Sequence, residues 1–236
     1  MLSFTALTTL DTQLEPLRGA WAPNPSHGSY MHSLVNLFID IPTSIISDSM
    51  RRIAGSSALK PFHGSQTLLG TAYTVRVRAG DNLYIHDALR KAQSGDVLVI
   101  DGGGDTDRAL VGEIMMSVAR MRGLAGLVVD GAIRDSDAFR QANYPCYARA
   151  VTHRGPFKNG PGELNLPVSI DGCVVTPGDI IAGDSDGVVF IPSDMAETVA
   201  AASRNKMRTE EAVLAGIAKG QYDDTWIDDA LKHQHV

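Results

Sequence analysis

The sequence predicts an α/β fold of the α+β kind, a sandwich with a mixed sheet in a single domain that carries helical arms at its termini. Two short runs, at 96–101 and 126–131, are almost wholly apolar, and a stretch of helical periodicity lies between them. Strands that helices cover on both faces have this composition, so the pair indicates a parallel β–α–β unit. From residue 146 onward the runs are short and are separated by Gly and Pro. That later pattern favours added strands over a purely doubly wound sheet.

The first half of the chain predicts helices and strands in alternation. In order, these are a helix that follows Pro42 and stops at Gly55, a strand at 68–78, a helix at 82–93, the strand at 96–101, a helix that begins at Asp107 or Gly112 and ends at Gly123, the strand at 126–131, and a short helix to about residue 141. Thr43 or Ser44 can cap the first helix and Asp81 the second, because their side chains accept N–H groups. The residues expected to face the core are Ile45, Ile46, Met50 and Ile53 on the first helix, and Leu83, Ile85, Ala88 and Leu89 on the second.

The second half predicts mostly strands. In order, we expect a strand at 146–151, a Gly/Pro-rich loop at 153–165 that could be mobile, a strand at 168–175, a Pro-Gly turn at 176–179, strands at 180–183 and 187–192, and a long helix at 194–219 that Ser193 caps. These elements give an N-terminal arm at 1–40, a central domain at 41–220 and a C-terminal tail at 221–236. The tail has too few apolar residues to fold alone, so we expect it to dock on the body or on another subunit.

Charge and composition exclude several classes of function. The net charge is −6 and no basic stripe accompanies the aromatic residues, which argues against nucleic-acid binding. No apolar run approaches the ~20 residues that span a membrane, and the first residues do not resemble a secretory signal. Two cysteines, Cys146 and Cys173, are too few for a disulfide framework and are expected to be small buried residues. A cytoplasmic protein is expected.

Two short segments at one edge of the sheet carry the predicted site. Gly112 precedes a helix start, and an Arg-Asp pair follows the next strand 22 residues after it. Parallel strands end at the same edge, so the helix start and this pair should converge. The residues concerned are Gly112, Glu113, Ile114, Met115, Arg134 and Asp135.

These residue types suit a small α-keto acid. The first N–H groups of a helix lack intrahelical partners and attract a carboxylate. Arg134 offers a guanidinium fork for a carboxylate or an enolate oxygen. Asp135 is a hard oxygen ligand, and a lone carboxylate with several waters is a common Mg²⁺ or Mn²⁺ site. The opposing interpretation is a surface ion pair of ~0–1 kcal/mol after a strand, with Gly112 only a helix cap.

Other motifs are weaker candidates for a functional site. The run Gly102-Gly103-Gly104 follows a strand as a nucleotide or methyl-donor loop would, but Asp105 stands where a further glycine is needed. His233 and His235 lie in a polar tail without zinc spacing. His86 is expected to be a core or rim histidine. Cys146 has no adjacent base, so thiol catalysis is not expected.

Several of these runs together resemble the RraA-like family, which contains aldolases for 4-hydroxy-4-methyl-2-oxoglutarate and 4-carboxy-4-hydroxy-2-oxoadipate and the regulator of ribonuclease activity A. The matching segments, over about residues 40–216, are Gly70–Val75, Gly80–Asn82, Gly95–Val99, Gly112–Met115, Gly126–Asp135, Pro177–Asp179 and Asp184–Val188. The resemblance implies a swivelling β/β/α fold and a homotrimer, or a hexamer of two trimers.

The resemblance also implies roles for the predicted site. Residues 112–115 would bind the pyruvyl part of the substrate, Arg134 would stabilise the enolate, and Asp135 would hold the divalent metal. Glu210 or Glu211 of a neighbouring subunit could join the site. The expected function is therefore a metal-dependent class II pyruvate aldolase with oxaloacetate decarboxylase side activity, in which metal-activated water takes the proton of the distal hydroxyl. The alternative is a non-enzymatic regulator that binds a protein partner.

Overall fold

The computed structural model describes residues 33–232, and one large mixed sheet organises them. Within this range nine strands form the sheet in the order β1-β6-β5-β3-β2-β10-β11, with β4 beside β5 and β7 beside β2, while β8 and β9 form a separate pair. The strands are β1 (Lys60–Pro61), β2 (Leu68–Val77), β3 (Asp96–Asp101), β4 (Ala109–Val111), β5 (Gly126–Ile133), β6 (Cys146–Val151), β7 (Gly162–Leu164), β8 (Val168–Ile170), β9 (Cys173–Val175), β10 (Ile180–Gly183) and β11 (Val188–Ile191). The helices are α2 (Thr43–Ser49), α3 (Leu83–Lys91), α4 (Glu113–Met121), α5 (Ser136–Ala142), α6 (Ala196–Ile217) and α7 (Thr225–Lys232), with a 3-10 turn at Ser193–Met195.

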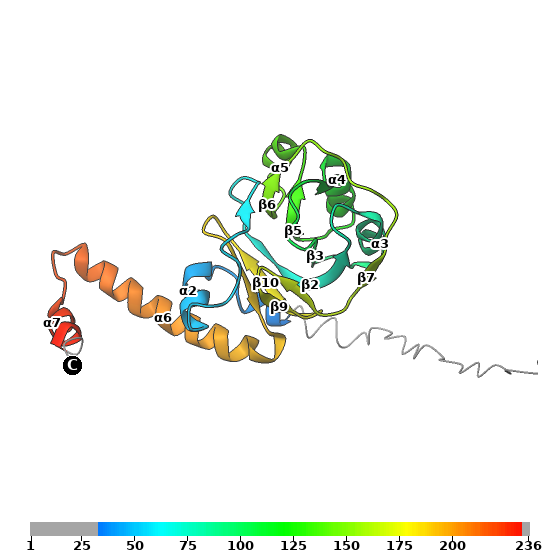
Figure 1. Cartoon of the computed structure of the whole chain (residues 1–236). Helices are drawn as coiled ribbons and strands as arrows, with labels where there is room; N and C mark the ends of the chain where they lie inside the picture. Colours follow the sequence, from blue (N-terminus) through cyan, green and yellow to red (C-terminus); the bar gives the residue numbers. More distant parts are fainter. Residues whose placement is uncertain (1–32, 233–236) are drawn as a thin grey trace, which may run out of the picture.

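The predicted parallel unit and the mixed sheet are both confirmed. β3 lies between β2 and β5 and runs parallel to both, and β6 runs parallel to β5. β10 continues the sheet antiparallel to β2, and β11 pairs antiparallel with β10 (Figure 1). Because the parallel strands end at one edge, the segments after β3 and β5 lie at that edge together.

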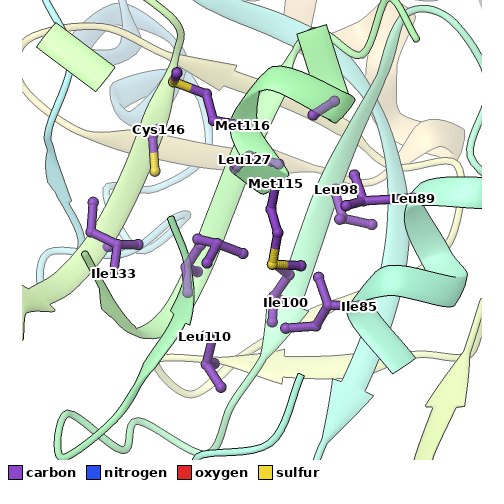
Figure 2. Close-up of a cluster of buried hydrophobic side chains, with 14 of the residues drawn as sticks. Ile85, Leu89, Leu98, Ile100, Leu110, Met115, Met116, Leu127, Ile133 and Cys146 are labelled. Carbon is purple, nitrogen blue, oxygen red and sulfur yellow. The ribbon is translucent and has the colours of Figure 1, made fainter. Parts of the chain in front are cut away.

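Both faces of the parallel strands are buried, which explains their nearly unbroken apolar sequence. Leu98 and Ile100 of β3 belong to the core cluster that α3, α4 and α5 cover, whereas Val97 and Val99 belong to a cluster on the opposite face. Figure 2 shows the first cluster, in which Met115 extends from α4 toward the strands. The β8–β9 hairpin covers the other face.

A third cluster joins α2 and the beginning of α6 to β10 and β11. Leu34 and Phe38 are buried in it, so the end of the predicted N-terminal arm packs on its own chain. Residues 1–32 of that arm lie outside the described residues. Within residues 33–232, no helix is both long enough and apolar enough to cross a membrane.

The C-terminal elements leave the body of the protein. Only the first two turns of α6 contribute buried residues, and its third turn still contacts α2 through an ion pair between Lys206 and Asp48. The rest of the helix projects away with α7 at its far end (Figure 1). α7 itself has no buried residue, so the described part of the predicted tail does not dock on its own chain. Docking on another subunit stays a prediction.

Three details of the predicted helices are wrong. α2 ends early because Arg51 and Arg52 both adopt left-handed backbone, and Ile53 is then 79% exposed instead of inward. Thr43 does not cap α2; the Asp184 carboxylate accepts its N–H at 2.8 Å from the β10–β11 turn. Leu83 lies in the first turn of α3 beyond the core and is 42% exposed.

Further differences concern loops and helix starts. Residues 109–111 form β4, so the helix that follows begins at Glu113 and not at Asp107. The expected strand at 168–175 is a hairpin, because Asp171 and Gly172 take left-handed conformations between β8 and β9. Ser193 does not cap α6 with its side chain; its own N–H donates to the Asp179 carboxylate at 3.3 Å.

Candidate functional site

The predicted site residues converge at the edge of the sheet. Glu113, the first residue of α4, donates its backbone N–H to Asp135 Oδ2 at 3.0 Å. Arg134 Nε lies 3.7 Å from the same oxygen, and each of the two side chains is 44% exposed. The topology thus joins a helix start, a guanidinium and a carboxylate, whereas the roles assigned to them stay predictions.

Gly112 is required by space at this junction. Its backbone is extended, so its φ of −150° is open to any residue. A Cβ at this position would lie 2.6 Å from Asp135 Oδ2 and 2.9 Å from Arg134 Cγ. A larger residue would therefore displace the Arg-Asp pair from the helix start.

The amide end of α4 is partly occupied already. The N–H of Glu113 is bonded to Asp135, whereas those of Ile114 and Met115 have no acceptor within residues 33–232. The sequence predicted three free amides, and two remain for a carboxylate. Ile114 is 75% exposed, so a ligand can approach its backbone from solvent.

Asp135 sits in a left-handed conformation, with φ 57° and ψ 39°. It is the N-cap residue of α5, and its carbonyl accepts the N–H of Ala138 at 2.9 Å. Non-glycine residues rarely adopt this backbone, and they do so where surrounding structure holds them. The turn between β5 and α5 thereby directs the Asp135 carboxylate back to α4.

A cavity of about 270 Å³ opens beside Arg134 and Gly112. Met115 and Ile114 of α4 line it as the sequence predicted. Three further polar residues line it that the sequence did not single out as site residues: Asn82, His86 and Lys158. Asn82 and His86 share one face of α3, and their spacing of four residues was the available signal.

Burial and then the charge of Lys158 lower the pKa of His86, so its ring is neutral near neutral pH.

A second, shallower depression of about 590 Å³ lies on the other side of Arg134. Glu113, Asp135 and His153 are among its lining residues. Arg134 lines both hollows and separates the carboxylate side of the site from the α3 side.

Asp81 fastens the loop that closes the smaller cavity. Its Oδ2 accepts the N–H groups of Asn159 at 2.7 Å and Gly160 at 3.0 Å, and its Oδ1 caps α3 at Leu83 as predicted. Burial acts to raise the pKa of Asp81, but these amide hydrogen bonds and Arg78 outweigh it and hold the pKa below its usual value. The loop expected to be mobile is therefore anchored to the start of α3.

The donor set suits a hydrated cation better than a dehydrated one. Within the described residues, no group of three or more His, Cys, Asp or Glu side chains is placed to hold a metal. Asp135 offers one hard carboxylate oxygen that faces a solvent-filled depression, which Glu113 also lines. Mg²⁺ and Mn²⁺ accept such sites because water completes their coordination.

Glu210 pairs with Lys206 at 3.2 Å, and Lys206 pairs in turn with Asp48 of α2. Its participation, or that of Glu211, in a neighbouring subunit's site stays a prediction.

The alternative motifs have structural explanations. The amides of Gly102 and Gly104 donate to the Asp130 carbonyl, and that of Gly103 donates to the Asp101 carboxylate. The three glycines therefore have no free amide to cradle a phosphate or a methyl donor. Cys146 is fully buried, and burial raises the pKa of its thiol, which excludes a thiolate nucleophile.

The fold and the site together define an α/β protein in which a helix start, an arginine and an aspartate meet at the carboxyl edge of a mixed sheet. The sequence model of the RraA-like family, described as Aldolase/RraA, matches residues 43–190. This chain therefore belongs to the RraA-like family. Its mixed α/β fold is that of the family's solved structures.

Similar proteins are named either as aldolases or as an RNA-processing inhibitor. A protein of Halalkalibacterium halodurans named "Putative 4-hydroxy-4-methyl-2-oxoglutarate aldolase" is 40% identical over 179 residues, which is 75% of this chain and 85% of that protein. A 4-hydroxy-4-methyl-2-oxoglutarate aldolase of Thermus thermophilus is 35% identical over 133 residues, 56% of this chain and 80% of its own. The structure of the RNA-processing inhibitor RraA from Thermus thermophilus has a TM-score of 0.60 and 32% identity, covering 65% of this chain and 94% of its own.

Proposed function

We propose that this chain is a divalent-metal-dependent class II pyruvate aldolase. The proposed substrates are of the 4-hydroxy-4-methyl-2-oxoglutarate or 4-carboxy-4-hydroxy-2-oxoadipate type, with oxaloacetate decarboxylation as a side activity. The observation that carries the proposal is the meeting of Asp135, Arg134 and the amide end of α4 where two hollows adjoin at Arg134. The names of the two aldolase relatives agree with it.

Each residue has a task that its position allows. The free amides of Ile114 and Met115 bind the carboxylate of the oxo-acid head. Asp135 holds the cation, which supplies a Lewis acid for the keto group when bound. Arg134, between the two hollows, faces the oxygen on which enolate charge develops.

The chemistry is the cleavage of the C3–C4 bond of the substrate. The electron pair of that bond moves into the pyruvate enolate, and the C4 hydroxyl becomes a carbonyl as it gives its proton to a water molecule. The enolate then takes up a proton at C3 and leaves as pyruvate. Arg134 binds the enolate more strongly than the neutral ketone, and such a difference lowers the barrier. In oxaloacetate, carbon dioxide leaves instead and the same enolate remains.

The second candidate is a non-enzymatic regulator, which the name of the solved Thermus thermophilus RraA structure favours. A protein-binding surface has no need of a cation at Asp135. The regulator hypothesis therefore predicts partner binding that survives chelation. The aldolase hypothesis predicts pyruvate release that is lost on chelation.

The test measures pyruvate release from both hydroxy acids and from oxaloacetate, with Mg²⁺ and after chelation. Asp135→Asn should lose the activity because the amide side chain is a poor cation ligand. The matched control is Asp87→Asn on the outer side of α3, which should behave as the native chain. Pyruvate release that is unchanged both by the chelator and by Asp135→Asn would refute the mechanism. Absence of pyruvate release from all three substrates would favour the regulator.

Assembly as a homotrimer or a hexamer belongs to the same proposal. The projecting half of α6 and all of α7 expose apolar residues, among them Leu214, Trp226 and Leu231. Such a surface suits contact with another copy of the chain. Sedimentation of the full chain measures it directly, and a monomer would contradict it.

A further inference from the structure

One residue in the wall of the smaller cavity carries a buried hydrogen-bond acceptor that has no partner among the described residues. Asn82 is only 4% exposed and lines this cavity together with Arg134 and Lys158. Within residues 33–232 its Oδ1 has no hydrogen-bond partner. Buried polar atoms are nearly always paired, so an unpaired one at a cavity wall points to a ligand.

The orientation of the Asn82 amide is fixed by its other end. Nδ2 donates to the Leu110 carbonyl at 3.0 Å and lies 3.3 Å from Met115 Sδ. Exchanging oxygen and nitrogen would set two oxygens against each other at Leu110, so the unpaired atom is the oxygen. Because that oxygen can only accept, the group that pairs with it must be a donor.

The rest of the cavity is matched to negative charge. Lys158 and Arg134 are the charged residues of its lining, His86 is neutral, and none of the lining residues is acidic. These cations bind the carboxylates of an oxo acid. A carboxylate or a ketone oxygen cannot donate to Asn82, whereas a hydroxyl can.

We propose that Asn82 Oδ1 accepts the hydrogen of the C4 hydroxyl of the substrate and so selects 4-hydroxy-2-oxo acids. This inference rests on the proposed function and deepens it, because it places the hydroxyl-bearing carbon on the α3 side of Arg134. The oxo-acid head lies at the free amides of Ile114 and Met115, which line the same cavity as Asn82. Asn82 is a specificity-determining residue and does not take the proton, since a neutral amide oxygen is too weak a base.

Specificity follows from the cost of leaving this acceptor unpaired. A site built to hydrogen-bond a substrate hydroxyl strongly rejects an analogue that lacks it, because the protein group then stays buried without a partner. Oxaloacetate has no hydroxyl at the corresponding carbon. The native chain should therefore prefer the hydroxy acid by kcat/KM, and this preference should depend on Asn82.

The experiment compares native protein and Asn82→Ala in two measurements on the same preparation. The first is kcat/KM for 4-hydroxy-4-methyl-2-oxoglutarate, which should fall about 10–100-fold because one hydroxyl contact is lost. The second is competitive inhibition by 2-oxoglutarate, which has the same five-carbon chain but lacks both the C4 hydroxyl and the C4 methyl group. Its inhibition constant should change less than about threefold, since it never used the acceptor.

Loss of the Leu110 hydrogen bond in Asn82→Ala could deform the cavity, and the 2-oxoglutarate measurement detects this. Parallel weakening of both ligands would mean that Asn82 only shapes the cavity, and the proposal would be overturned. Unchanged cleavage of the hydroxy acid would also overturn it. Arg90→Gln, on the exposed side of the same helix, is the matched control and should leave both values unchanged.

Failure of the proposed function and failure of the hydroxyl assignment give different results. If the native chain releases no pyruvate from the hydroxy acid under any metal condition, the proposed function fails and the inference falls with it. If the native chain cleaves it and Asn82→Ala gives either contrary result, the hydroxyl assignment alone is wrong.

Discussion

Replacing Asp81 with Asn should both destabilise the fold and loosen the loop over the smaller cavity. The Asp81 side chain is 1% exposed and joins α3 to residues 159 and 160 through one oxygen, Oδ2. Asn keeps one acceptor oxygen, which can still cap α3 at Leu83. Its NH₂ group would then face the two loop amides, and both of those hydrogen bonds would be lost.

The magnitude follows from the two lost bonds. Hydrogen bonds to charged groups contribute ~1.5–3 kcal/mol each. Taking the lower part of that range, since the loop can relax toward water, gives a loss of ~3–4 kcal/mol in the free energy of unfolding. The matched control is Asp87→Asn on the outer side of α3, which removes an ion pair with Lys91 and should cost at most ~1 kcal/mol.

Urea denaturation followed by circular dichroism measures both variants. Asp81→Asn should lower the midpoint without a large change in slope, and pyruvate release should show a raised KM because the loop also presents Lys158 to the cavity. An Asp81→Asn protein as stable as the Asp87→Asn protein would refute the reasoning. It would mean that the N–H groups of residues 159 and 160 can bond to water without loss in the free energy of unfolding.

The same side chain sets a direction for pH dependence. The fold lowers the pKa of Asp81, so the ionised form is favoured in the folded state. Its stabilisation is present above the unfolded-state pKa of about 3.9 and is lost as the pH falls below that value through the folded-state pKa. The difference in stability between native and Asp81→Asn proteins should therefore be constant near neutral pH and shrink below about pH 4. A difference that grows in acid would contradict this assignment.

The remaining predictions concern the site and the core. Gly112→Ala should lose most pyruvate release with little change in the urea midpoint, because the added Cβ would meet Asp135 Oδ2 at 2.6 Å on an exposed surface; a fully active variant would contradict this. Arg134→Ala should lower kcat by about 10²–10³, as removal of one oxyanion donor does, without loss of stability, and steady-state kinetics beside a melting curve check both parts. A thiol reagent should modify Cys173 and spare Cys146 in the folded protein, since burial raises the pKa of Cys146 and hides its sulfur; mass spectrometry that finds Cys146 modified before unfolding would refute it.

The spacing of apolar residues predicted the order of strands and helices, because the burial of each residue depends mainly on its position within its own element. The run at 96–101 is apolar on both faces of β3, and the structure buries both faces. The order of strands and helices then predicted that Gly112 and Arg134 meet, since parallel strands share an edge. The end of α2 could not be predicted in this way. Arg51 and Arg52 adopt left-handed backbone there, and nothing in their local sequence indicates it.

The amino-acid sequence by itself determined the parallel unit, the mixed sheet and the edge at which the Arg-Asp pair faces a helix start. Only the tertiary structure decided that Asp135 takes the Glu113 amide, that Asp184 caps α2 from the β10–β11 turn, and that Asn82 and Lys158 share a cavity with Arg134. The reason is physical. A burial period repeats every few residues and can be read along the chain, whereas a hydrogen bond between residues far apart depends on how whole elements pack.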